Sequence, residues 1–267
     1  DTPSSRGLGD VYKRQVFFSK SKTSSCSSRL GKIEKKEESS TNEIGIRAII
    51  NKKQSIVSTT NLEKQNVYNL TEKVVEMAKV VPENQYCGLA ESDKIKQVSK
   101  QEVQKLEICD TYEPTMSLIE KEVIKLEESA LDNKEITNSE GAEIAYSKNS
   151  ICLLGSNGLE IEMEKTHSDF IIAVLAGSKD SMEREYDYKS KVFYNELGDF
   201  EKIGKEVSQN AIKKLNSRKL KTCKSDVIFD SKVSSSLLRN LFSASNAQSI
   251  VKGISFLKDK MNNKVFN

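Results

Sequence analysis

The sequence has few aromatic and imidazole side chains. Its 267 residues include no Trp, one His and three Pro, and aromatic residues make up 6% of the chain. A zinc site built on two histidines is therefore excluded within this chain, because it needs two imidazole ligands. No apolar run approaches the roughly 20 residues that cross a bilayer, so contact with a membrane is not predicted.

An excess of one charge is also missing. The chain has 42 Lys and Arg against 39 Asp and Glu, and its formal net charge is +3. Proteins built around phosphate contacts carry a clear basic excess, so direct binding of nucleic acid is not predicted. The five cysteines form no Cys-x-x-Cys pair, and we interpret them as reduced thiols of a cytosolic protein.

Three local patterns have a chemical and a structural interpretation. His167 would be the base of a Cys–His nucleophile, but we interpret it as an exposed residue at a turn or strand end between two strands. Glu160, Glu162 and Glu164 share one face of a predicted strand, where they would bind a cation or form the solvated face of a sheet. We favour the solvated face. The segment Gly155–Gly158 lacks the Gly-Lys-Ser/Thr ending of a phosphate loop and predicts a hairpin turn.

Both ends of the sequence suggest that it is a fragment. Ser5–Gln15 reads SRGLGDVYKRQ, which resembles the translated adapter and transposon end of a tagmentation sequencing library. We therefore set residues 1–15 aside as a non-native leader. The last residues, MNNKVFN, show no closing helix or strand pattern. We expect a chain that is cut at both ends.

Hydrophobic periodicity predicts an α+β fold. Period-two alternation, as at Ile44–Ile50 and on both sides of the hairpin turn, indicates antiparallel strands, and a further short strand is expected at Val227–Phe229. Apolar residues that step by three and four indicate helices. These helices are expected near residues 67–81, 115–131, 200–215 and 232–248.

The order of these elements predicts antiparallel sheets flanked by helices, in two domains plus the start of a truncated third. After the leader, the expected parts are a first domain at 16–82, a linker at 83–109, a middle domain at 110–217 and the start of a C-terminal domain at 225–267.

Several stretches, in their order along the chain, resemble the TldD/PmbA family of bacterial peptidase-associated proteins. The likeness runs from Val16 to the last residue and is strongest to the PmbA (TldE-type) branch. The stretches that carry it are SSCSSRLGKIEKKEESSTNEIGIRAII (24–50), VEMAK (75–79), PENQYCGLA (82–90), TNSEG (137–141), SNG (156–158), AIKKLNSRKLKT (211–222) and GISFL (253–257).

The family's catalytic branch carries His-Glu-x-x-x-His on a helix, where the imidazoles hold zinc and the Glu activates water. The resemblance places Arg239 and Ala244 at the two His positions and Asn240 at the Glu position. Arg is cationic, Ala has no ligand atom and Asn is no general base. We therefore expect no catalytic, cofactor-binding or metal-binding residue in this chain.

The resemblance implies a non-catalytic, cytoplasmic subunit that pairs with a TldD-like catalytic chain. The zinc would lie in that partner, and the complex would degrade or mature unfolded peptides. One alternative is a non-enzymatic binding or regulatory protein that acts on DNA gyrase or on a toxin–antitoxin system. Another is an independent zinc hydrolase whose ligands lie wholly outside this sequence.

Overall fold

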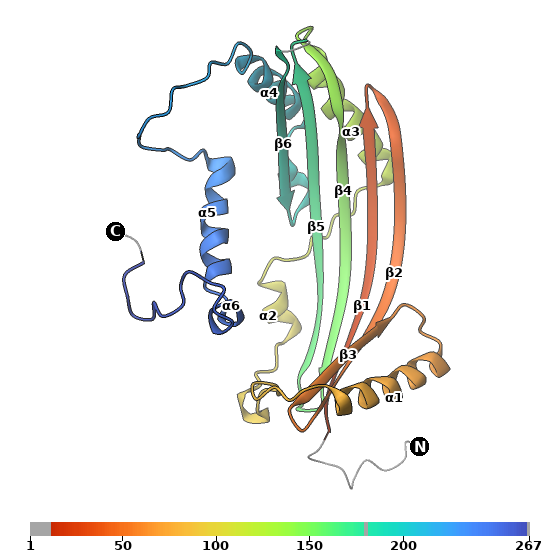
Figure 1. Cartoon of the computed structure of the whole chain (residues 1–267). Helices are drawn as coiled ribbons and strands as arrows, with labels where there is room; N and C mark the ends of the chain where they lie inside the picture. Colours follow the sequence, from red (N-terminus) through yellow and green to blue (C-terminus); the bar gives the residue numbers. More distant parts are fainter. Residues whose placement is uncertain (1–11, 179–180, 266–267) are drawn as a thin grey trace. The chain divides into compact units, whose positions relative to one another are not determined.

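The computed structural model describes residues 12–178 and 181–265, and they form one antiparallel sheet with helices (Figure 1). The α+β class is thereby confirmed. The strands follow the order β3-β2-β1-β4-β5-β6 across the sheet. Their bounds are β1 (Tyr12–Arg29), β2 (Lys32–Ile50), β3 (Lys53–Thr59), β4 (Ile136–Gly155), β5 (Glu160–Ala176) and β6 (Glu183–Lys191).

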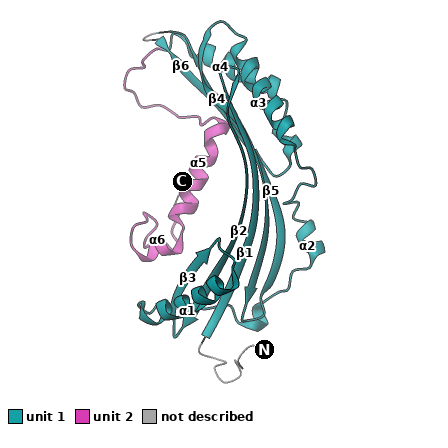
Figure 2. Cartoon of the chain, turned by 90° about the vertical axis from the view of Figure 1, so that its right-hand side faces the viewer, with its two compact units in different colours: residues 1–217 teal, residues 218–267 magenta. Residues whose placement is uncertain are grey.

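Strands that were expected in two separate domains are joined through the pairing of β1 with β4. Gln15–Ser28 of β1 pairs with Ala142–Gly155 of β4 in antiparallel register. The first and middle parts of the chain therefore share one sheet, which is strongly curved (Figure 2). Nothing in the local sequence signals this pairing, because it joins segments more than 100 residues apart.

The helices agree closely with the predicted stripes, and some of their ends have identifiable caps. The Thr115 hydroxyl accepts a hydrogen bond from Leu118 N at the start of α3, and Asp199 accepts one from Glu201 N at the start of α4. The helix bounds are α1 (Lys64–Val80), α2 (Lys100–Gln104), α3 (Met116–Leu131), α4 (Phe200–Lys213), α5 (Ser231–Ala244) and α6 (Ala247–Val251). Short 3-10 turns lie at η2 (Ser92–Lys94) and η4 (Tyr194–Leu197).

Two apolar cores lie on one face of the sheet. The larger core packs α3 and α4 against residues such as Cys26, Ile144 and Phe170, and the smaller one packs α1 against Ile46 and neighbouring side chains. In β1, the residues that contribute to these cores have even numbers. Because side chains alternate along a strand, the odd-numbered residues of β1 point to the opposite face. We call that opposite face the open face.

Three local expectations differ from the structure. His167 lies within β5, because this strand runs without a break from Glu160 to Ala176, whereas the sequence analysis placed it between two strands. Val227–Phe229 forms no strand. The edge strand β6 was not predicted, because its sequence EREYDYKSK lacks aliphatic alternation. The hairpin turn at Gly155–Gly158 is confirmed between β4 and β5.

The segment that was expected to be a non-native leader falls partly outside the described residues. Residues 1–11 are not described, whereas Tyr12–Gln15 pairs with Arg47–Ile50 as the first part of β1. The strand thus extends four residues into the segment that the sequence analysis set aside.

The chain divides into two compact units, residues 1–217 and residues 218–267 (Figure 2). Unit 1 contains the sheet with α1 to α4, and unit 2 contains α5 and α6. Ser255 is the one buried residue among those described in unit 2, where large apolar side chains such as Leu238 and Phe242 are exposed. None of the helices in the described ranges is both long and apolar enough to cross a membrane.

Candidate functional site

Helix α5 carries the residues that the resemblance places at the zinc-motif positions. The helix begins after Asp230, whose side chain accepts a hydrogen bond from Lys232 N. Arg239 and Asn240 are exposed on it, and Ala244 is half-buried near its end. The Ala244 carbonyl oxygen accepts a hydrogen bond from Ser255 Oγ at 2.6 Å, which ties the end of α5 to the segment after α6.

These three side chains offer no ligand set for zinc. A guanidinium stays protonated and has no lone pair to donate, and a methyl group has no donor atom at all. Within the described ranges, no three His, Cys, Asp or Glu side chains come close enough together to hold a metal ion. The expected loss of zinc binding and of the general base stays a prediction, because it depends on the alignment with the family motif.

His167 contacts a serine and a carboxylate on the open face of the sheet. Its Nε2 atom lies 3.1 Å from Ser190 Oγ and 3.5 Å from Asp169 Oδ1. A Ser–His–Asp triad needs the hydroxyl and the carboxylate on different ring nitrogens, so that one nitrogen takes the proton while the other is held. Here Ser190 Oγ lies 3.4 Å from Nδ1 as well as 3.1 Å from Nε2, so the hydroxyl approaches both nitrogens and the carboxylate holds neither of them alone. This cluster therefore does not have the geometry of an activated serine nucleophile.

Two opposing effects act on the pKa of Asp169 in this cluster. Partial burial raises the pKa of Asp169, and the neighbouring imidazole acts against that rise. The side chains of His167 and Asp169 are 54% and 42% exposed, so both remain accessible to a binding partner.

Small hydroxyl side chains line the middle of the open face. In β1 they are Ser19, Ser21, Thr23, Ser25 and Ser27, and their register partners on β4 include Ser147 and Asn149. Neither core cluster includes any of these residues. Charged residues flank this row, because Glu43 and Glu37 of β2 lie opposite Ser19 and Ser25, and Lys165 of β5 lies opposite Asn149. The hydroxyl groups of the row can hydrogen-bond to polar uncharged groups such as peptide amides.

The predicted wet face of β5 is confirmed in part. Glu160, Glu162 and Glu164 are exposed, and the last of these accepts a hydrogen bond from Ser150 Oγ and pairs with Lys148 Nζ at 3.2 Å. These contacts hold the pKa of Glu164 below its usual value. The three carboxylates thus act as solvated surface groups.

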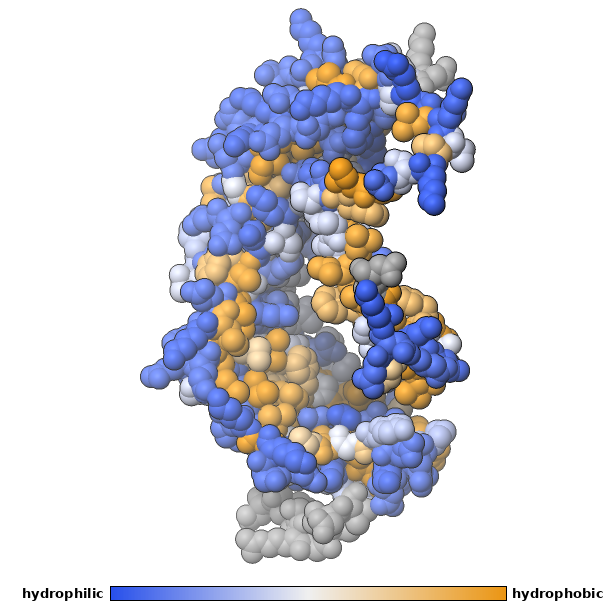
Figure 3. Space-filling view, turned by 90° about the vertical axis from the view of Figure 1, so that its left-hand side faces the viewer, coloured by the Kyte–Doolittle hydropathy of each residue, from blue (hydrophilic) through white to orange (hydrophobic). Residues whose placement is uncertain are grey.

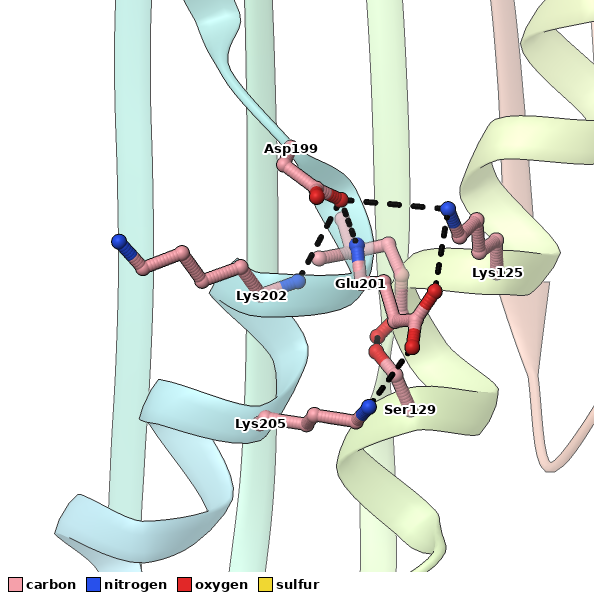
Figure 4. A network of polar contacts seen from close by, with 7 residues as sticks. Lys125, Ser129, Asp199, Glu201, Lys202 and Lys205 are labelled. Atoms are coloured by element: carbon pink, nitrogen blue, oxygen red, sulfur yellow. Dashed lines mark hydrogen bonds and ion pairs between the residues drawn. The ribbon is translucent and has the colours of Figure 1, made fainter.

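A network of ion pairs joins the outer surfaces of α3 and α4 (Figure 4). Lys125 of α3 lies 3.2 Å from Glu201 and 3.9 Å from Asp199, and Lys205 lies 2.7 Å from Glu201. The two lysines hold the pKa of Glu201 below its usual value. The groove between these helices contains charges of both signs, and the ion pairs among them connect the two helices.

Family models of the PmbA/TldA metallopeptidases match most of the chain. The model of domain 1 matches residues 15–78, that of the central domain residues 93–215 and that of the C-terminal domain residues 222–267. The chain belongs to the PmbA/TldD metallopeptidase family. The central-domain match begins within the expected linker, whose residues include η2 and α2.

Curated relatives with the name PmbA agree with this assignment. The metalloprotease PmbA of Escherichia coli O157:H7 is 24% identical over 252 residues, which cover 94% of this chain and 55% of the relative. A PmbA homologue of Buchnera aphidicola (subsp. Baizongia pistaciae) is 25% identical over 219 residues, which cover 80% of this chain and 47% of the relative. The chain spans about half the length of the curated relatives it matches.

Solved structures share the fold. A proposed modulator of a DNA gyrase from Thermotoga maritima matches with a TM-score of 0.79 at 16% sequence identity. The match covers 96% of this chain and 57% of the Thermotoga chain. A protein of the same description from Bacteroides thetaiotaomicron matches with a TM-score of 0.80 at 18% sequence identity. The match covers 95% of this chain and 57% of the Bacteroides chain. TldE from Thermococcus kodakarensis matches with a TM-score of 0.61 at 18% sequence identity. The match covers 75% of this chain and 44% of the TldE chain.

Proposed function

We propose that this chain is the PmbA/TldE-like subunit of a TldD-type zinc metallopeptidase, and that a TldD-like partner supplies the zinc. The observation that carries the proposal is the chemistry of α5. The resemblance places Arg239, Asn240 and Ala244 at the motif positions, and their side chains neither ligate zinc nor take a proton from water. A family member without these groups depends on another chain for hydrolysis.

In this role the chain would help enclose unfolded peptides. The open face supports the role, because its hydroxyl groups can hydrogen-bond to peptide amides without selecting a sequence. The complex would form in the cytoplasm as a heterodimer and would degrade or mature its peptides there. This chain would make no direct contact with nucleic acid or with a membrane.

The test is co-expression of the full-length gene product with the TldD-like protein of the same genome. Each chain alone and the pair would be assayed for cleavage of an unstructured peptide. We expect a stable complex, and we expect cleavage by the pair but none by this chain alone. Cleavage by this chain alone would contradict the proposal and would favour a zinc hydrolase with ligands outside this sequence.

A second candidate is a binding protein that acts on DNA gyrase or a toxin–antitoxin system. Two structural neighbours are described as proposed modulators of DNA gyrase, which favours this candidate, although their identity of 16% and 18% extends the likeness to the fold alone. A pull-down that captures gyrase subunits and no TldD-like chain would support this candidate over the peptidase subunit.

A further inference from the structure

Three apolar side chains are exposed side by side on the open face, at the edge of the sheet. Ile171 of β5 is 46% exposed, and Tyr186 and Tyr188 of β6 are 40% and 52% exposed. The register places Ile171 directly opposite Tyr188. We call these three residues the aromatic shelf. Figure 3 shows the side of the molecule that carries β6, where hydrophobic residues are exposed among polar ones.

The aromatic shelf is held in place before any ligand binds. The rings of Tyr186 and Tyr188 stack with their centroids 6.2 Å apart and their planes 9° from parallel. The guanidinium of Arg184 lies 5.1 Å from the Tyr186 ring centroid, and its Nε and Nη2 atoms bond to Glu140 at 2.9 and 2.8 Å. A surface that is fixed in advance loses little conformational entropy on binding.

Strand β6 also offers a free backbone edge next to the shelf. Among the described strands it pairs only with β5, so β6 is the last strand on its side of the sheet. In an antiparallel strand every second residue directs its N–H and C=O groups away from its neighbour. One acceptor near the start of the strand, the Arg184 carbonyl, is already bonded to Lys214 Nζ at 3.2 Å. The rest of the edge can pair with an extended chain.

The charge beside the shelf is negative. Asp169 lies opposite Ser190 of β6, whose small side chain leaves the carboxylate accessible from the free edge. Glu143 lies opposite Ile171 on β4, and no ion pair involves it in the described part of the structure. Arg184, the cation on β6 that shares this face, is bonded to Glu140. A basic side chain is therefore complementary to this end of the open face, and it can also lie against the tyrosine rings.

We propose that the aromatic shelf and the free edge of β6 bind an extended, unfolded polypeptide segment that adds to the sheet as a further strand. An aromatic or aliphatic side chain of the segment lies on Tyr186 and Tyr188. A Lys or Arg two residues along the segment reaches over Ser190 toward Asp169. The inference rests on the proposed function and deepens it, because it names where this subunit holds the peptide and which side chains it prefers.

The absence of tryptophan from the chain makes binding directly measurable. The probe is an unstructured peptide of about eight residues, a typical strand length, with one Trp and a Lys two positions later. Its fluorescence reports binding to the 267-residue chain without background from the protein. The comparison peptides replace the Lys by Gln, or carry N-methyl groups on alternate amides, which removes the edge hydrogen bonds.

We expect the wild-type chain to bind the probe, and the Tyr186→Ser/Tyr188→Ser variant to bind it about 10-fold more weakly, since two aromatic contacts are lost. Asp169→Asn should weaken binding of the Lys peptide and leave the Gln peptide unchanged. The N-methylated peptide should not bind. Tyr68→Ser is the matched control, because Tyr68 is 60% exposed on α1, away from the shelf.

No binding by the wild-type chain, or equal affinity of the N-methylated and plain peptides, would overturn the proposal. Equal affinity of the double variant and wild type would also overturn it. The N-methylated peptide is tested on the wild-type protein, so its result stands even if the double variant fails to fold. These outcomes are distinct from failure of the proposed function, which is measured by complex formation and cleavage with the TldD-like partner.

Discussion

At the residue scale, the buried carboxylate of Glu127 connects helix α3 to the turn between β1 and β2. It is fully buried, and its two oxygens accept hydrogen bonds from Leu30 N at 2.8 Å and Gly31 N at 3.2 Å. Both turn residues have positive φ, so the turn directs its N–H groups to one acceptor. The sequence did not reveal this contact, because the partners lie 97 residues apart.

Glu127→Gln keeps the size of the side chain but replaces one acceptor oxygen with a donor. The lost bond leaves the buried side chain and a partly buried turn N–H without their partner, so we expect a loss of about 1–3 kcal/mol in the free energy of unfolding, measured by urea denaturation. The exposed neighbour Glu128→Gln is the control and should change it by less than about 0.5 kcal/mol. Equal effects of the two substitutions would contradict the assigned role.

Two buried tyrosines provide a second comparison. The hydroxyl of Tyr146 has no hydrogen-bond partner among the residues that the structure describes, whereas that of Tyr194 donates to Glu122. Removing an unpaired buried hydroxyl loses no bond, so Tyr146→Phe should leave stability unchanged or slightly raised. Tyr194→Phe should cost about 1–3 kcal/mol, because it leaves the carboxylate without its partner. Thermal or urea unfolding of both variants checks this order, and the reverse order would contradict it.

Alkaline pH should separate the Tyr146 variant from wild type as well. Burial raises the pKa of Tyr146 from 10.0 to about 12, so the native state keeps a proton that the unfolded chain releases. Because the native state binds more protons in this range, its stability falls as the pH rises from 10 to 12. Tyr146→Phe should lose this component, which a pH series of unfolding curves detects as a shallower decline.

At the element scale, the crossing of α3 and α4 depends on a glycine. A Cβ atom on Gly204 would overlap the Ser129 hydroxyl and the Leu126 carbonyl oxygen of α3. Since a carbonyl of the backbone cannot rotate away, Gly204→Ala must push the helices apart. We expect a loss of about 1–3 kcal/mol in unfolding free energy, as for other overpacked cores. Gly88→Ala is the control, because no atom lies within 4 Å of the added Cβ.

The elements that could be predicted are those with strong periodicity. Helices α3 and α4 and the alternating end of β2 follow from apolar spacing, because each buries one regular face. The first half of β5 also follows from its pattern, because Ile161 and Met163 alternate with glutamates. Strand β6 could not be predicted, because its sequence EREYDYKSK lacks aliphatic alternation. The Tyr-x-Tyr spacing at 186–188 is the one local signal of the aromatic shelf in the sequence.

At the scale of the whole molecule, two units are joined by a basic segment without helix or strand. Arg218, Lys219, Lys221 and Lys224 are all exposed there. We expect brief trypsin treatment to cut first within residues 218–224 and to leave a stable fragment that contains the complete sheet. Mass spectrometry of the early fragments checks this. A first cut within β1 to β6 would contradict the division into units.

The number of units differs from the number of family domains for a physical reason. Three domain models match the chain, yet the first two contribute strands to one sheet, so they form a single compact unit. Pairing of distant strands leaves no local pattern in a sequence, whereas the composition of the basic segment does mark the boundary near residue 217. Family resemblance, and not periodicity, identified the positions of Arg239, Asn240 and Ala244.

The central proposal is that this chain holds no zinc of its own and that a TldD-like partner holds the zinc of the complex. The most direct test is the zinc content of the purified full-length product, alone and in complex with that partner, by elemental mass spectrometry after dialysis. We predict no bound zinc for the product alone and one zinc per complex. Stoichiometric zinc on the product alone would contradict the account. A second contradiction would come from a complex in which Arg239, Asn240 and Ala244 of this chain are substituted and the partner's motif is intact. Loss of zinc from that complex would show that this chain holds the metal.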